Sequence, residues 1–288
     1  MLTVLWIVFL AILASSKIAL QSTVARRELH GIDERILFNG IIFLVAALIF
    51  LPSGIGCITP GTSFYGCVIG IASIGFQLFY VLSMSNGPVS LTVMFNNFSM
   101  LIPTVASVFL FGEALKLTQM IGIILILLSF AVTVRAEKEA RISAKWIVYI
   151  LLTVIINGSM SLIQKLYTQT PDAALINGFV FMTYFSAVIG SAVILLLTSF
   201  RKQRIVKLKC TRRMWLFGLP AGITLGIYHL LYTQSIAAIL GVLLFPTLNG
   251  LIIIISSLFS MLFFRERLTR RQILGCLIGI TAIVFMSI

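Results

Sequence analysis

The sequence predicts an all-α integral membrane protein with ten transmembrane helices, arranged as two inverted repeats of five helices each. Three observations predict this fold class: a very apolar composition, ten apolar stretches long enough to span a membrane, and a motif that occurs twice. Of the 288 residues, 60% are hydrophobic and only 10% are charged, and the mean hydropathy is +1.13. Because a soluble domain carries about 25% charged residues, this composition excludes a water-soluble protein.

A transmembrane helix needs about 20 mostly apolar residues, and ten stretches of the chain meet this requirement. Their approximate bounds are 2–22, 36–51, 64–84, 89–111, 117–135, 145–166, 175–198, 214–234, 239–263 and 271–288. The connections are short, and three of them contain turn signals, at 52–54, 86–88 and 170–172. We therefore expect two domains of five helices each, at 1–135 and 145–288.

A motif with an aromatic residue, a glutamate and a glutamine occurs twice, at an offset of 153 residues (111 to 264). The copies read Phe111-Gly112-Glu113-Ala114-Leu115 followed by Gln119 and Gly122, and Phe264-Arg265-Glu266-Arg267-Leu268 followed by Gln272 and Gly275. The same offset aligns Asn96 with Asn249. Near the start of the halves, Ser15-Ser16 aligns with Gly158-Ser159 at an offset of 143 residues (15 to 158). A repeat at half-length indicates duplication. Because each half crosses the membrane an odd number of times, the halves are expected to be inverted.

Nearly all Lys and Arg residues lie in alternate loops, which connect each odd-numbered predicted span to the next one. They are Arg26, Arg27 and Arg35; Arg135, Lys138, Arg141 and Lys145; Arg201, Lys202, Arg204, Lys207, Lys209, Arg212 and Arg213; and Arg265, Arg267, Arg270 and Arg271. The positive-inside rule places these loops in the cytoplasm, and hence both termini outside the cell (plasma or inner) membrane. Membrane orientation therefore explains the net charge of +13 better than nucleic-acid binding does.

The doubled motif resembles the EamA-type repeat of the drug/metabolite transporter superfamily. The closest match lies at 110–134 and 263–287, and the segments 76–110 and 229–263 match more loosely. The resemblance implies a secondary transporter of a small metabolite, often an exporter, with a central cavity formed by the first, third and fourth helices of each repeat. It also implies cytoplasmic termini, which is the opposite of what the charges predict.

Polar side chains on these helices are the candidate substrate-binding residues, because polar groups in hydrocarbon are costly unless they face a cavity or a partner. They are Lys17, Gln21, Gln77, Tyr80, Asn96, Asn157, Gln164, Tyr228, His229, Tyr232 and Asn249. Each also has a structural interpretation. Lys17 can extend towards the membrane surface, the amides can bond to neighbouring helices, and His229 and the tyrosines can pack in the interior. Lys165, nearer a helix end, is interpreted as an interfacial anchor.

None of the eight acidic residues lies in the middle of a predicted span. A proton-driven exporter of cations typically needs a buried carboxylate, so the pattern favours a neutral, zwitterionic or anionic substrate such as an amino acid. We expect no catalytic residue, metal, cofactor or nucleic-acid partner; the expected partners are the substrate and the lipid bilayer, and the expected assembly is a monomer or a dimer. Two alternatives stay open: a lipid-carrier flippase, and an integral membrane enzyme, which two histidines without an acidic cluster support poorly.

Overall fold

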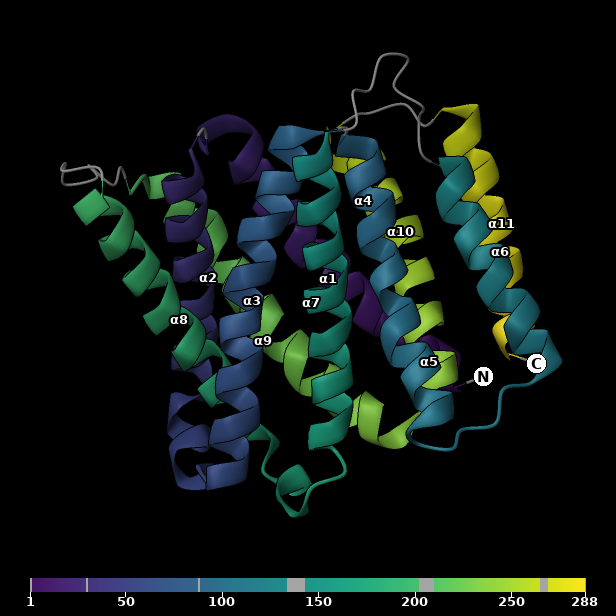
Figure 1. The fold of residues 1–288 in the computed structure, drawn as a ribbon, viewed down its shortest axis with the longest axis horizontal. Helices are drawn as coiled ribbons and strands as arrows, with labels where there is room; N and C mark the ends of the chain where they lie inside the picture. The colour runs from purple at the N-terminus through teal and green to yellow at the C-terminus, as the bar shows by residue number, and fades with distance from the viewer. Residues whose placement is uncertain are drawn as a thin grey trace. The chain divides into compact units, whose positions relative to one another are not determined.

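The computed structural model of the chain is all-α over the residues that it describes, which are 2–29, 31–87, 89–133, 143–201, 210–264 and 269–287 (Figure 1). Its α-helices are α1 (Leu2–Glu28), α2 (Ile32–Gly54), α3 (Pro60–Asn86), α4 (Val89–Asn97), α5 (Leu101–Phe109), α6 (Leu117–Thr133), α7 (Ala144–Tyr167), α8 (Ile176–Arg201), α9 (Arg212–Ala238), α10 (Gly241–Phe264) and α11 (Arg270–Ser287). Three short 3₁₀ segments accompany them: η1 (Ile55–Cys57), η2 (Phe98–Met100) and η3 (Pro171–Ala174).

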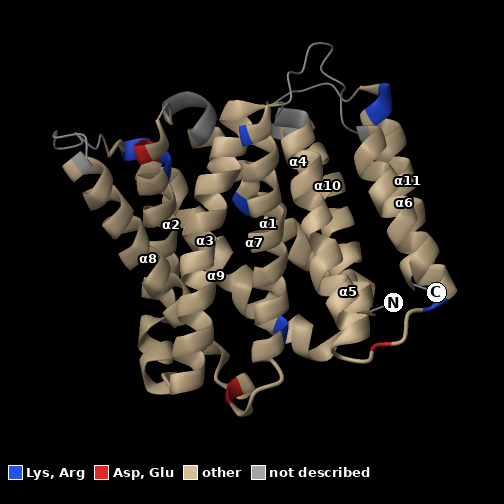
Figure 2. Cartoon of the chain, viewed as in Figure 1, with Lys and Arg blue, Asp and Glu red and all other residues tan. Residues whose placement is uncertain are grey.

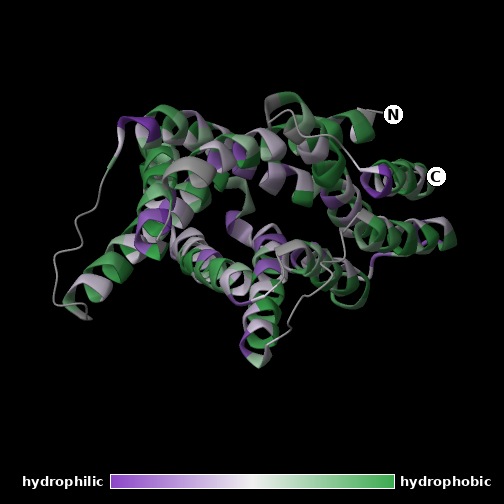
Figure 3. Ribbon diagram, turned by 90° about the horizontal axis from the view of Figure 1, so that it is seen from above, coloured by the Kyte–Doolittle hydropathy of each residue, from purple (hydrophilic) through white to green (hydrophobic). Residues whose placement is uncertain are grey.

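Eight segments of the described chain are helical, long and apolar enough to cross a membrane. They are α1, α2 with η1, α3, the rod formed by α4, η2 and α5, then α7, α8, α9 and α10. The fifth predicted span corresponds to α6, a shorter apolar helix, and the tenth to α11, which is apolar along most of its length (Figure 3). The prediction of an all-α, multi-pass membrane protein is confirmed, whereas the exact number of ten spans stays a prediction.

The turn predicted at 52–54 is wrong, because these residues are helical. α2 contains Pro52, ends at Gly54 and continues as η1 to Cys57. Proline removes one backbone donor from a helix, and membrane helices tolerate that loss when neighbouring groups compensate. The chain leaves the helical conformation only at Ile58, which has φ −81° and ψ 118°. The second span is therefore longer than the sequence indicated.

The described helices gather into two compact units. The first unit comprises Met1–Ser15, Phe79–Leu162 and Ser235–Ile288, and the second comprises Ser16–Leu78 and Ile163–Gln234. Each unit contains segments from both halves of the sequence, and helices α1, α3, α7 and α9 contribute residues to both units. The predicted sequence repeats at 1–135 and 145–288 are thus a different division from the spatial one, and they stay a prediction.

In the first unit, α6 and α11 pack against each other in opposite directions (Figure 1). The Ser129 hydroxyl donates to the carbonyl oxygen of Gly275 over 2.7 Å. A Cβ added at Gly122 would lie 3.1 Å from the carbonyl oxygen of Ala282. At the repeat offset of 153 residues, Gly122 corresponds to Gly275 and Ser129 to Ala282. The two contacts therefore join equivalent pairs of positions, with the roles of the two helices exchanged. The helix pair therefore has a local two-fold relation.

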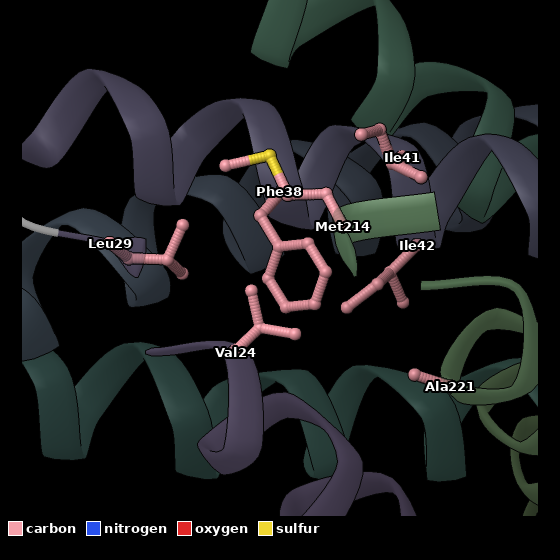
Figure 4. Close-up of a cluster of buried hydrophobic side chains, with 7 residues drawn as sticks. All are labelled: Val24, Leu29, Phe38, Ile41, Ile42, Met214 and Ala221. Carbon is pink, nitrogen blue, oxygen red and sulfur yellow. The ribbon is translucent and has the colours of Figure 1, made fainter. Parts of the chain in front are cut away.

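In the second unit, α2 packs against α8 and α9. The α9 residues Gly218, Gly222 and Gly226 face α2, and a Cβ at Gly222 would lie 2.7 Å from the carbonyl oxygen of Ile42. Small residues at this spacing on one helix face allow such close helix contact. At one end of the unit, the Phe38 ring lies in an apolar cluster with Val24, Leu29, Ile41, Ile42, Met214 and Ala221 (Figure 4).

Candidate functional site

The predicted site residues are divided between the two units. Tyr80, Asn96, Asn157 and Asn249 belong to the first unit, and Lys17, Gln21, Gln77, Gln164, Tyr228, His229 and Tyr232 belong to the second. The two groups are therefore described separately.

In the first unit, an amide cluster joins α7 to the broken fourth span. The side-chain nitrogen of Asn157 donates to Asn96 Oδ1 over 3.2 Å and to Ser99 Oγ over 2.8 Å. Asn96 lies in α4 and Ser99 lies in η2, the 3₁₀ turn between α4 and α5. Asn96 and Asn157 are half-buried, whereas Ser99 is buried. We call Asn96, Ser99 and Asn157 the amide cluster below.

A proline explains why the fourth span is irregular at this position. Pro103 has no backbone N–H, so it cannot donate to the carbonyl oxygen of Ser99 four residues earlier. A 3₁₀ turn replaces regular α-helix over Phe98–Met100. Gly158 on α7 allows the close approach, because a Cβ there would lie 2.7 Å from the Ser99 carbonyl oxygen. Irregular backbone in a membrane segment is tolerated only where protein or a cavity surrounds it.

The equivalent position in the other half has a different chemistry. Ser15 on α1 aligns with Gly158, and its hydroxyl donates to the carbonyl oxygen of Ile252 on α10 over 3.3 Å. The Ser256 hydroxyl in turn donates to Ser15 Oγ over 3.2 Å. Asn249, the counterpart of Asn96, donates to the carbonyl oxygen of Phe245 on its own helix over 2.9 Å. The approach of Gly158 to the Ser99 carbonyl is thus repeated by Ser15 and Ile252, but the equivalent positions of the described chain do not repeat the amide cluster.

In the second unit, His229 lies in a closed group of buried polar and aromatic side chains. Its Nδ1 is 3.0 Å from the Tyr184 hydroxyl, and its ring packs edge-on against Phe179 and Tyr184. Gln164 Nε2 donates to Thr233 Oγ1 over 2.6 Å, and the Thr233 hydroxyl donates to the carbonyl oxygen of His229. These contacts fit the interpretation of His229 and Gln164 as packed interior residues.

The remaining candidates of the second unit differ in how they are bonded. Gln21 Nε2 donates to Asn39 Oδ1 over 2.7 Å, and the rings of Tyr228 and Tyr232 stack at 5.3 Å. Lys17 and Gln77 are half-buried, and neither side chain has a hydrogen bond or ion pair to any other residue that the structure describes. Their polar groups are therefore unused by the residues that the structure describes, as is the Tyr228 hydroxyl.

Lys165 does not have the exposure expected of an interfacial anchor. Its exposed fraction is 3%, so the side chain is packed inside the second unit. An anchor would extend its ammonium group away from the helix towards water. Proximity to a helix end was therefore a misleading criterion for this residue.

The first copy of the doubled motif forms a connection between the two halves. Gly112 has φ +66°, and the N–H groups of Gly112 and Glu113 donate to the carbonyl oxygens of Val108 and Ser107. This left-handed glycine cap ends the helix and turns the chain back. Glu113 Oε2 then accepts a hydrogen bond of 2.9 Å from the backbone N–H of Val242, at the start of α10.

The glutamines of both copies close the first turn of the helices that follow. Gln119 Oε1 accepts from the N–H of Lys116 over 3.1 Å, and Gln272 Oε1 accepts from the N–H of Thr269 over 2.8 Å. Each glutamine satisfies a backbone donor that the helix start leaves without a partner. Glu266, in the second copy, lies outside the described residues.

Sequence reasoning did not select Ser99, Tyr184 or Thr233, which are direct partners of selected residues. Ser99 follows Asn96 by three residues and Thr233 follows His229 by four, so helical spacing places each beside a selected residue. That spacing does not distinguish them from hydroxyls that bond only to their own helix. Tyr184 on α8 gave no such signal, because the resemblance did not place the second helix of either half around the cavity.

The comparisons with known proteins identify the family. The EamA-like transporter family matches residues 5–135 and 144–288, which is nearly the whole chain. The chain belongs to the EamA-like transporter family. This transporter also resembles a protein of known crystal structure, with a TM-score of 0.78 and 17% sequence identity over 98% of this chain and 95% of the other. That likeness shows the fold. No curated protein matches this EamA-like transporter.

Proposed function

We propose that this EamA-like protein is a secondary transporter, and more specifically an exporter, of a small metabolite such as an amino acid or a related neutral, zwitterionic or anionic compound. Ten helices in two inverted five-helix repeats would alternate access to a cavity near the middle of the membrane. The candidate residues named above would line that cavity, with His229 and Gln164 as packed residues of its wall. The chain would act as a monomer or dimer in the cell membrane, with its basic loops in the cytoplasm.

The observation that carries this proposal is the relation between α6 and α11. These helices are the last of the two halves, they run in opposite directions, and the repeat offset exchanges the Gly122–Ala282 contact with the Ser129–Gly275 contact. Duplicated halves of opposite direction are characteristic of secondary transporters, in which one structure opens to either side. The family match supports the same conclusion.

The distribution of charge supports the proposed substrate class. The acidic side chains that the structure describes lie in connections or in the first turn of a helix: Asp33, Glu34, Glu113 and Asp172 (Figure 2). Lys17, in contrast, lies within α1 and has no hydrogen bond or ion pair to another described residue. An ammonium group in an apolar segment favours an anionic partner, and a substrate carboxylate would provide one.

Transport is testable with the purified full chain in liposomes. We expect saturable, ATP-independent uptake of at least one radiolabelled compound from a panel of amino acids and related metabolites, and no uptake by protein-free liposomes. Absence of uptake and counterflow across the whole panel would contradict the proposal. Movement of a fluorescent lipid between leaflets, without metabolite uptake, would instead favour the flippase.

A further inference from the structure

The amide cluster of the first unit has hydrogen-bonding capacity that the protein does not use. Both hydrogens of the Asn157 amide nitrogen are engaged, one by Asn96 Oδ1 and one by Ser99 Oγ. Asn157 Oδ1 and Asn96 Nδ2, in contrast, have no partner among the described residues. The cluster therefore has one unused acceptor and one unused donor group, on two side chains that are already bonded to each other.

This conclusion does not depend on which amide atom is nitrogen and which is oxygen. If both amides are flipped, Asn96 Nδ2 and the Ser99 hydroxyl donate to Asn157 Oδ1, and the unused groups become Asn157 Nδ2 and Asn96 Oδ1. One donor group and one acceptor remain in either assignment. The pair is half-buried on both residues, where an unsatisfied polar group costs free energy.

The described charges of the first unit lie in a connection or at helix starts. The charged residues that the structure describes in the first unit are Glu113, Lys116, Lys145, Arg270 and Arg271. They lie in the connection after α5 or in the first two residues of α7 and α11, and not within α4, η2 or α5 (Figure 2). A charged ligand group would thus lose its hydration without gaining a described counter-charge in this unit.

We propose that the amide cluster is a binding subsite for an uncharged substrate group that carries a donor beside an acceptor, namely a carboxamide, a lactam or the edge of a nucleobase. Such a group would donate to the unused carbonyl oxygen and accept from the unused amide N–H. A carboxylate of the same shape offers acceptors alone. The inference rests on the proposed transport function and names the substrate chemistry for it.

The duplicated sequence does not repeat all three residues of the amide cluster. The residue that aligns with Asn157 in the first half is Ala14, and the residue that aligns with Ser99 in the second half is Ile252. Asn249, which aligns with Asn96, donates to the carbonyl oxygen of Phe245 on its own helix. The donor–acceptor pair is therefore a feature in which the halves have diverged.

Binding is tested with pairs of compounds that differ only in amide or acid: nicotinamide against nicotinate, and L-glutamine against L-glutamate. A ligand that binds the folded state raises the melting temperature. We expect a saturable rise in the melting temperature of the full chain in detergent with the amide of at least one pair, and a clearly smaller rise with its acid. Equal shifts within both pairs, or no shift with either amide, would overturn the proposal.

Variants connect the shift to the cluster. Asn157→Leu, of similar branched shape, should abolish the amide-induced shift. Thr153→Val, one turn earlier on α7, should retain it, because Thr153 Oγ1 contacts Tyr149 of its own helix and Ser83, and not the amide cluster. If Asn157→Leu does not fold, Ser99→Ala still tests the subsite. It should weaken apparent affinity by about 2- to 10-fold, with Thr104→Val, bonded to Met100 of its own helix, as the control. Unchanged affinity in Ser99→Ala and Asn157→Leu would refute the subsite.

Transport measurements separate this inference from the proposed function. If liposomes transport a metabolite and both Ser99→Ala and Asn157→Leu transport it with unchanged KM, the subsite is wrong and transport stands. If the amide compounds bind as expected but no compound is transported, the subsite stands and the transporter proposal fails.

Discussion

At the scale of single residues, Glu113 has a geometry that explains its place in the doubled motif. The left-handed Gly112 turns the chain, and the carboxylate then accepts the N–H of Val242 over 2.9 Å. A carboxylate at a helix start satisfies a free donor and interacts favourably with the helix dipole. The acidic position of the motif is therefore explained by a connection between the two halves.

Two replacements of Glu113 should lower the free energy of unfolding by different amounts. Glu113→Ala removes the acceptor and should cost about 1 kcal/mol, and Glu113→Gln, which keeps an acceptor but loses the charge, should cost less. Melting of both variants and the parent chain in the same detergent measures the difference. If Glu113→Ala melts at the parent temperature, the bond to Val242 contributes nothing to stability.

Single residues also show where sequence reasoning reached its limit. Asn96, Asn157 and Gln164 were selected because amides in apolar helices need partners, and each has a side-chain partner on another segment. Their partners Ser99 and Thr233 are ordinary hydroxyls, which bond to their own helix so commonly that sequence does not distinguish them. Lys165 was misjudged since distance from a helix end does not reveal packing.

At the scale of helices, glycines determine how closely neighbouring helices pack. A Cβ at Gly222 of α9 would lie 2.6 Å from Val45 Cβ and 2.7 Å from the Ile42 carbonyl oxygen of α2, whereas a Cβ at Gly56 would meet nothing within 4 Å. The two positions thus provide a matched pair for the same substitution.

We expect Gly222→Ala to destabilise the protein by about 1–3 kcal/mol, because α9 must move away from α2 to admit the methyl group. Gly56→Ala should have a much smaller effect. Thermal melting of both variants in one detergent tests this. A Gly222→Ala variant as stable as Gly56→Ala would show that the contact between α2 and α9 adjusts without cost.

Helix positions were predictable because apolar length is a direct physical requirement of the membrane. Helix irregularities were not. Pro52 was taken as a turn but lies inside α2, whereas Pro103 accompanies a 3₁₀ turn. The same residue type thus accompanies both outcomes, and sequence alone does not distinguish them; at Pro103 a Cβ added at Gly158 would lie 2.7 Å from the Ser99 carbonyl oxygen.

At the scale of the whole molecule, the sequence repeat and the spatial units divide the chain differently. Each unit combines equivalent helices of both halves, such as α2 with α8 and α6 with α11. The duplication was visible in the sequence, but this interleaving was not, because residue spacing carries no information on which copy packs against which.

The orientation of the molecule in the membrane is testable with two cysteines at opposite ends of the second unit. Cys210 is exposed and precedes α9, whose start packs beside the start of α2 at Phe38. Gly56 is exposed and lies beyond the other end of α2. One variant keeps Cys210 alone, with the other cysteines replaced; a second replaces all four and carries Gly56→Cys. Because the positive-inside rule places the basic 201–213 loop in the cytoplasm, an impermeant maleimide added to intact cells should label Gly56→Cys and leave Cys210 unlabelled.

Permeabilised cells, in which both should react, are the control. Labelling of Cys210 from outside, with Gly56→Cys protected, would reverse the orientation and agree with the cytoplasmic termini that the family resemblance implies.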